Sequence, residues 1–191
     1  MEFYEKPVSR KKVYEGLIVN VRDDSAELWN GKLVRREVVE HLGGVAIVPI
    51  DRDGNVIMVR QFRYPMGEEL LEIPAGKLEY GEDHYDCAVR ELSEETGCAA
   101  GKMIYLGPLY TSPGFSEEIL HIYLGLDLTE GEMHLDEDEF LRVERVPVSE
   151  VIEHIMENRI PDSKTIVGLF KAKAYLENKG DGVIEQDDFN R

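Results

Sequence analysis

The chain is poor in cysteine and in basic residues, and it has no long apolar run. Two cysteines, Cys87 and Cys98, stand among 191 residues, too few for a disulfide framework, so we expect a reducing compartment, the cytoplasm. No apolar stretch approaches the roughly 20 residues of a membrane-spanning helix. The first residues, MEFYEKPVSRKK, lack the apolar segment of a secretory signal. We therefore expect neither a membrane protein nor a disulfide-stabilised secreted one.

Positive charge is scarce as well. Lysine and arginine number 22 against 39 aspartates and glutamates, which gives a formal net charge of −17. Such a charge argues against nucleic acid or an anionic membrane as a partner. It also conflicts with an enzyme that acts on phosphates, unless bound metal ions supply the missing positive charge. A function directed at phosphates would therefore require a divalent metal.

The N-terminal region, residues 1–42, is predicted to be a separate β-rich unit. Weak alternation in 13–21, a short run at 25–28 and the segment 32–41 predict three strands, and Asn30-Gly31 is typical of a hairpin turn. Three short strands are marginal as an independent unit. We therefore expect this region to pack on something else, with a second subunit as one possibility.

Residues 43–179 are predicted to form the main domain, and 180–191 a mobile tail. Asp53-Gly54 between two apolar runs predicts a β-hairpin. Strands mixed with helices indicate an α/β or α+β fold, between which composition does not choose. The predicted strands are 45–50, 56–62, 70–73, 103–109, 119–126 and 140–146, and the predicted helices are 83–96, 149–158 and 162–178.

One stretch, GKLEYGEDHYDCAVRELSEETGC at 76–98, combines a tight turn with a capped helix. Asp83 is a suitable N-cap because its carboxylate can accept hydrogen bonds from the first helical turn. Gly97 suits the left-handed position that follows a helix. The residues expected on the buried side of this helix are Ala88, Val89 and Leu92.

Glu91, Glu94 and Glu95 stand at positions i, i+3 and i+4, so their side chains share one face of the predicted helix. Carboxylates at this spacing repel by about a few tenths of a kcal/mol per pair. Such residues are most often a solvated acidic face, but a hard divalent cation bound through oxygen would offset the repulsion. Arg90 is expected to point to a different side and to reach back to Glu82.

The full pattern G-x5-E-x7-R-E-U-x-E-E-x-G-U, with U an apolar residue, resembles the signature of the Nudix hydrolases. The resemblance implies an α/β/α sandwich around a mixed sheet, with the signature helix beside its centre. It implies that Mg²⁺ (or Mn²⁺) is held by Glu91, Glu94, Glu95 and the Ala75 carbonyl, with Glu94 among the catalytic residues. The remaining signature positions are Gly76, Glu82, Arg90 and Gly97, which support the turn, and the apolar Leu92 and Cys98.

A second layer of motifs resembles the ADP-ribose pyrophosphatase branch of that family. The resemblance implies hydrolysis of ADP-ribose to AMP and ribose 5-phosphate. Relatives that act on another ADP-sugar, GDP-mannose or a dinucleotide share much of it, and a non-catalytic nucleotide-sugar sensor is a further alternative. The motifs are VRQFR (59–63), EIPAGK (72–77), TSPGFSEE (111–118) with Pro113, and DEDEFLRV (136–143).

The resemblance places the catalytic base on the acidic loop, at Glu139. Glu137 lies one plausible register shift away. Without the family likeness, a charged loop of this kind is usually a solvated surface. A loop suits the chemistry, because it can bring a base in only when substrate is bound.

The resemblance also implies the substrate contacts. Arg63 would contact the pyrophosphate, unless it is a surface residue at a strand end, and Glu118 would hydrogen-bond the terminal ribose. Arg36 would pack on the adenine from the N-terminal strands of a partner subunit, which implies a homodimer. Relatives often place an aromatic residue opposite this arginine, whereas this chain has Ile18.

His84, His121 and Cys87 are expected to be surface or core residues. Neither histidine has a second histidine at metal-ligand spacing. Nothing near Cys87 in the sequence would activate a thiolate.

Overall fold

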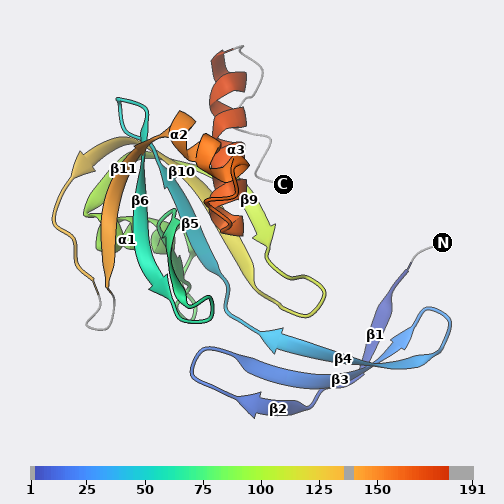
Figure 1. Ribbon diagram of the computed structural model, residues 1–191. Helices are drawn as coiled ribbons and strands as arrows, with labels where there is room; N and C mark the ends of the chain where they lie inside the picture. Colours follow the sequence, from blue (N-terminus) through green and yellow to red (C-terminus); the bar gives the residue numbers. More distant parts are fainter. Residues whose placement is uncertain (1–2, 136–139, 181–191) are drawn as a thin grey trace. The chain divides into compact units, whose positions relative to one another are not determined.

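The computed structural model describes residues 3–135 and 140–180 (Figure 1). The contacts divide the chain into two compact units. The first contains the chain up to Gly43 together with Tyr110–Ile119, and the second contains Gly44–Leu109 and the chain from Leu120 onward. Of the predicted tail 180–191, only Gly180 lies within the described residues, where it ends the last helix.

The first unit is an antiparallel sheet of four strands: β1 (Glu5–Ser9), β2 (Lys12–Glu15), β3 (Asn20–Leu28) and β4 (Leu33–Glu40). β1 and β2 pair with successive parts of one edge of β3, and β4 pairs with the other edge. The Asn30-Gly31 turn between β3 and β4 is confirmed, with Gly31 at φ 82°.

The prediction of three N-terminal strands was wrong. The predicted strand 13–21 is broken by a turn, in which the Gly16 amide donates to the Val19 carbonyl at 3.1 Å. β3 then begins at Asn20 instead of Ser25. The first six residues of β3, NVRDDS, include three charged residues and few of the β-branched and aromatic residues that favour strands, so no local pattern indicated a strand there.

This sheet leaves many large apolar side chains exposed. The side of β3 that is covered carries Arg22, Asp24 and Ala26 at alternate positions, so it is partly polar. The exposed large apolar residues of the unit are Phe3, Tyr4, Val8, Val13, Tyr14, Leu17, Ile18, Trp29, Leu33, Leu42, Tyr110 and Phe115.

The second unit holds two sheets. One has the order β8-β5-β10-β9 and the other β11-β6-β7, and because β5 pairs parallel with β10 but antiparallel with β8, the first is mixed. The strands are β5 (Gly44–Pro49), β6 (Asn55–Arg63), β7 (Glu68–Glu72), β8 (Ala75–Lys77), β9 (Cys98–Tyr110), β10 (Ile119–Glu130) and β11 (Leu141–Pro147).

Three helices complete this unit: α1 (His84–Thr96), α2 (Val148–Met156) and α3 (Ser163–Gly180) (Figure 1). Val45 and Ile47 of β5 pack in one core cluster with Leu92 of α1. Ala46 and Val48 pack in the other with residues of α2 and α3. Since side chains alternate along a strand, β5 lies between two helical layers. The predicted α/β/α sandwich around a mixed sheet is confirmed.

Several predicted bounds of the second unit need correction. β7 begins two residues earlier than predicted, β10 extends to Glu130, and β9 begins at Cys98 because tertiary pairing extends it through the weakly strand-forming residues CAAGK. Ala88 and Leu92 are buried as predicted, but Val89 is 43% exposed. Among the described residues, no helix is long and apolar enough to cross a membrane.

Two histidines form part of an aromatic cluster at the edge of the α1-side core. The rings of His84 and His121 stack with centroids 4.0 Å apart at an angle of 8°. The His121 Nδ1 shares a hydrogen bond of 2.9 Å with the Tyr105 hydroxyl, and His84 Nδ1 is bonded to the Tyr123 hydroxyl. Burial, followed by the proximity of His84, lowers the pKa of His121, with a smaller opposing effect from Asp83.

This cluster predicts a loss of stability in mild acid. The unfolded chain binds a proton at His121 at higher pH than the folded chain does, so the free energy of unfolding falls as the pH drops below about 6.5. The free energy of unfolding is measured by urea titration at about pH 7.5 and at about pH 5.5. We expect the difference between the two values to be smaller in His121→Phe than in the wild type. Identical differences in the two proteins would contradict this explanation.

Candidate active site

The helix α1 that carries the glutamates has both predicted caps. The Asp83 carboxylate accepts from the Tyr85 amide at 2.8 Å. Gly97 follows the helix at φ 69°, and its amide donates to the Ser93 carbonyl at 2.9 Å. These caps satisfy backbone groups that a helix end leaves without partners, and they fix where the helix begins and ends.

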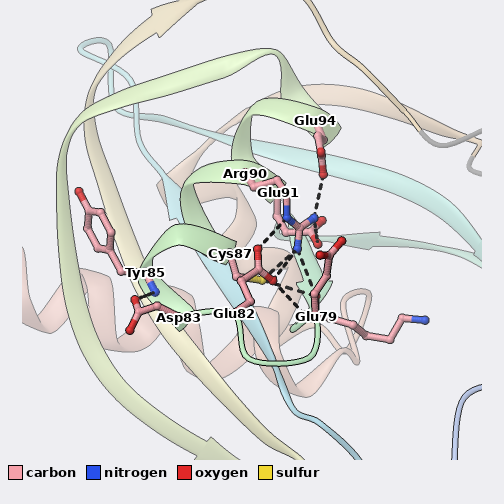
Figure 2. A network of polar contacts seen from close by, with 9 residues as sticks. Glu79, Glu82, Asp83, Tyr85, Cys87, Arg90, Glu91 and Glu94 are labelled. Atoms are coloured by element: carbon pink, nitrogen blue, oxygen red, sulfur yellow. Dashed lines mark hydrogen bonds and ion pairs between the residues drawn. The ribbon is translucent and has the colours of Figure 1, made fainter.

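Arg90 lies among the glutamates, not on a different side as predicted (Figure 2). Its Nε donates to Glu82 Oε1 at 2.9 Å, which confirms the expected link back to the turn. The same guanidinium donates through Nη1 to Glu91 Oε1 at 2.7 Å and to Glu94 Oε2 at 2.9 Å. One cation therefore connects three carboxylates of the turn and the helix.

This arrangement changes the electrostatics of the cluster. The hydrogen bonds from Arg90, followed by one from the Glu79 amide, lower the pKa of Glu82 to about 2. The pKa of Arg90 is raised, chiefly by Glu82. From the sequence, we expected a bound metal ion to offset the repulsion among the glutamates. Arg90 offsets part of this repulsion in its place. Three carboxylates around one guanidinium still leave the cluster negative.

Glu95 and Glu91 are fastened to the segment before the helix. Glu95 is 1% exposed, and its Oε2 accepts from the Ala75 amide at 2.9 Å. The Glu91 carboxylate lies against Gly76, where an added Cβ would come within 1.8 Å of the carboxyl carbon. Only glycine at position 76 leaves room for this carboxylate.

The oxygen atoms of this site suit a hard divalent cation by their chemistry. Over residues 3–135 and 140–180, however, no three His, Cys, Asp or Glu side chains are gathered closely enough to hold an ion. Arg90 engages Glu91 and Glu94, and the Ala75 amide engages Glu95. Binding of an ion by these side chains therefore requires their carboxylates to come closer together than they lie in this structure.

Arg63 pairs with Glu72, a residue that the sequence reading missed. Its Nε and Nη2 donate to the two Glu72 oxygens at 2.8 and 2.7 Å, and Lys164 bonds to the same carboxylate. Glu72 is 1% exposed. Burial acts to raise its pKa, but Arg63 and Lys164 prevail and hold the pKa of Glu72 below its ordinary value. In the sequence, the feature that could have pointed to Glu72 as a buried partner is its place as a charged residue within the apolar run LLEIPAG.

The start of α3 holds the segment that leads to Ala75. The Thr165 hydroxyl accepts from the Ile73 amide at 3.0 Å and donates to Asp162 Oδ2 at 2.6 Å. Thr165 is fully buried. The segment between β7 and β8 is therefore fixed from one side by α3 and from the other by Glu95.

Glu139 and Glu137 lie outside the described residues. On the N-terminal side of residues 136–139, the His134 amide donates to the Glu94 carbonyl at 3.1 Å. On the other side β11 begins at Leu141, which pairs with Gln61 of β6. The chain on each side of the predicted base is thus anchored in the second unit.

The predicted adenine and ribose contacts belong to the first unit, whereas the glutamates, Ala75 and Arg63 belong to the second. Arg36, on β4, forms an ion pair with Glu5 at 2.7 Å. Glu118 accepts a hydrogen bond of 2.7 Å from the Thr111 hydroxyl. Ile18 is 56% exposed, between β2 and β3.

A surface hollow of about 360 Å³ lies between β7 and the connection from α2 to α3. Arg60, Leu71, His154 and Ile160 are among its lining residues. None of the predicted site residues lines it.

The chain is similar to known proteins in both sequence and structure. A NUDIX domain model matches residues 40–166. The chain is 42% identical over 169 residues to a methanol dehydrogenase activator of Bacillus methanolicus, covering 87% of this chain and 91% of that protein. It is 40% identical over 163 residues to an ADP-ribose pyrophosphatase of Bacillus subtilis, covering 84% and 88%. A crystal structure of an ADP compounds hydrolase superposes with a TM-score of 0.80 at 25% identity, covering 92% and 96%.

The capped helix, its glutamates and the layered fold thus define a hydrolase of a metal-using class. The chain belongs to the Nudix family. Within that family it is a hydrolase of the ADP-ribose pyrophosphatase-like branch. Nudix hydrolases generally use divalent metal ions. The two relatives from Bacillus carry different named functions at nearly equal identity to this chain.

The contact between Glu91 and Gly76 predicts the effect of a single methyl group. Gly76→Ala should lower the free energy of unfolding by about 1–3 kcal/mol, because the added Cβ forces the Glu91 carboxylate and its neighbours aside. Gly114→Ala is the matched control, since an added Cβ there has no atom within 4 Å. Denaturant unfolding of both variants measures the difference, and equal stabilities would contradict the close contact.

Proposed function

We propose that this protein hydrolyses the pyrophosphate bond of ADP-ribose to AMP and ribose 5-phosphate with Mg²⁺ (Mn²⁺ as substitute). The observation that carries the proposal is the cluster of Glu91, Glu94 and Glu95 at the Ala75 segment. It occurs in a chain that is 40% identical to an ADP-ribose pyrophosphatase. A pure sensor of nucleotide-sugars would have no need for such a cluster.

In this proposal Glu91, Glu94, Glu95 and the Ala75 carbonyl hold the metal. When bound, the metal supplies positive charge where negative charge develops on the pyrophosphate oxygens. Arg63 contacts the pyrophosphate, and Glu72 with Lys164 fixes the orientation of that guanidinium. Orientation of this kind is useful because a donor aimed in advance needs no reorganisation during the reaction.

The proton of the attacking water passes to Glu139, with Glu137 as the alternative. Support comes from the anchoring on each side, at His134 on the Glu94 carbonyl and at Leu141 on β6. A carboxylate outside the metal cluster can act as a base without giving up a metal ligand.

We also propose a homodimer formed through the N-terminal strands of residues 1–42, with the hydrolase domain in 43–179. The exposed apolar residues of the first unit support this, because large exposed apolar surfaces mark sites of contact with other proteins. In the dimer Arg36 of one chain packs on the adenine, and Glu118 bonds the terminal ribose. The two unpaired, buried cysteines fit a reducing cytoplasm.

A direct assay separates this proposal from its alternatives. The purified chain is incubated with ADP-ribose, another ADP-sugar, GDP-mannose and a dinucleotide, each with Mg²⁺, with Mn²⁺ and with a chelator. Metal-dependent release of AMP, fastest from ADP-ribose, is the expected result. Faster turnover of another substrate would reassign the specificity. Tight binding without any turnover would identify a sensor.

Glu94 provides the cleanest test of the metal cluster. Its side chain is 39% exposed, whereas Glu95 is buried, so replacing Glu95 would also disturb the fold. Glu94→Gln should lower kcat by about 100-fold, since several kcal/mol of charge stabilisation depend on the ion. Glu153→Gln, on the exposed side of α2, is the control. Wild-type turnover in Glu94→Gln would remove this residue from the site.

The base assignment predicts a different kinetic signature. Glu139→Gln should lower kcat by about 100-fold or more with little change in KM, as expected for loss of a proton acceptor. Glu137→Gln, two residues away on the same loop, serves as the comparison and should retain most activity. The reverse outcome would transfer the role to Glu137.

A further inference from the structure

The segment Thr111–Glu118, called here the ribose loop, is bonded to the N-terminal sheet. The Val39 amide on β4 donates to the Phe115 carbonyl at 2.7 Å, and the Glu117 amide donates to the Val39 carbonyl at 2.9 Å. Val39 and Ser116 thus form a parallel β-bridge. The loop lies between β9 and β10 in the sequence, yet it groups with the N-terminal unit by its contacts.

Arg22 of β3 adds a side-chain clamp to this backbone pairing. Its Nη2 donates to Glu117 Oε1 at 2.9 Å and its Nη1 to Glu117 Oε2 at 3.3 Å, which is a bidentate contact with the loop. The guanidinium also donates to Glu40 and to Asp24. The Arg22 side chain is 10% exposed and the Glu117 side chain 49% exposed, so this contact is shielded from solvent on the side of the arginine only.

The side chain next to Glu117 is held differently. Glu118 accepts at Oε2 from the Thr111 hydroxyl at 2.7 Å. Its Oε1 lies 3.7 Å from His41 Nδ1, a nitrogen that already accepts from the Gly43 amide at 3.0 Å. His41 Nδ1 is therefore an acceptor and donates nothing to Glu118. The Oε1 atom keeps capacity for a hydroxyl donor, such as that of a sugar.

We propose that Arg22 is a positioning residue, which fixes the ribose loop through Glu117 and thereby sets the direction of Glu118. The sugar part of this inference rests on the proposed function, which assigns Glu118 to the terminal ribose. It follows that two different parts of the chain serve sugar recognition and metal chemistry. Recognition of the sugar depends on the N-terminal sheet, and the metal chemistry depends on the glutamates of the second unit.

The loop side of the clamp is tested with Glu117→Gln, because Glu117 is 49% exposed and its replacement leaves the sheet intact. We expect KM for ADP-ribose to rise about tenfold with kcat retained, as for loss of one oriented hydrogen bond. The preference for ADP-ribose over ADP-glucose should fall by a similar factor. Asp23→Asn is the matched control. Asp23 lies next to Arg22 on β3 and pairs with Arg35 of β4, not with the ribose loop, so its replacement should change neither value.

A second measurement needs no substrate. Hydrogen exchange at the Ser116 and Glu117 amides should be faster in Glu117→Gln than in wild type, and unchanged in Asp23→Asn. Combining Arg22→Met with Glu117→Gln should speed exchange no further than Arg22→Met alone, because both changes remove the same contact.

The two measurements separate the possible failures. Unchanged exchange in Glu117→Gln would overturn the clamp itself. Faster exchange with unchanged KM and unchanged preference would overturn its role in sugar recognition. A wild-type protein that does not hydrolyse ADP-ribose would overturn the proposed function and the sugar role with it, while the exchange data would still decide whether Arg22 holds the loop.

Discussion

The site depends on one shared cation, the Arg90 guanidinium. Its hydrogen bonds to Glu82, Glu91 and Glu94 join the turn before α1 to two successive turns of the helix. Without that cation the carboxylates would repel one another and the turn would lose its link to the helix. One oxygen of Glu91 and one of Glu94 are thus held by the protein's own cation.

The surrounding fold makes this arrangement rigid. β5 packs against α1 on one side and against the other helices on its opposite side, which fixes the helix relative to the sheet. The segment between β7 and β8 is held by Thr165 and by Glu95 at its two ends. The Ala75 carbonyl and the glutamates therefore belong to one packed unit, in which small displacements are resisted by a close-packed core.

Local chemistry explains what the sequence could predict. The caps at Asp83 and Gly97 and the common face of the glutamates follow from helix geometry alone. The contact of Arg90 with Glu94 is an i,i+4 pair, which helix geometry also favours. The contact of Arg90 with Glu91 does not follow from helix geometry, because it depends on the rotamer that the arginine adopts. The pair of Glu72 with Lys164 joins residues 92 positions apart, and no local pattern marks it. β3 was missed in part since its charged residues are buried by tertiary contacts that the sequence does not display.

The charge balance around the glutamates gives a physical reason, beyond family membership, to expect dependence on a metal. Arg90 is surrounded by carboxylates, and Arg63 and Lys164 share the buried Glu72. Because these positive charges are offset within the protein, a pyrophosphate with its own negative charge would meet a site without an excess of positive charge. In a chain with a net charge of −17, long-range attraction cannot make up the difference. In the proposed function, the affinity for a bridged diphosphate therefore comes from divalent ions, while Arg90 and Arg63 hold carboxylates of the protein.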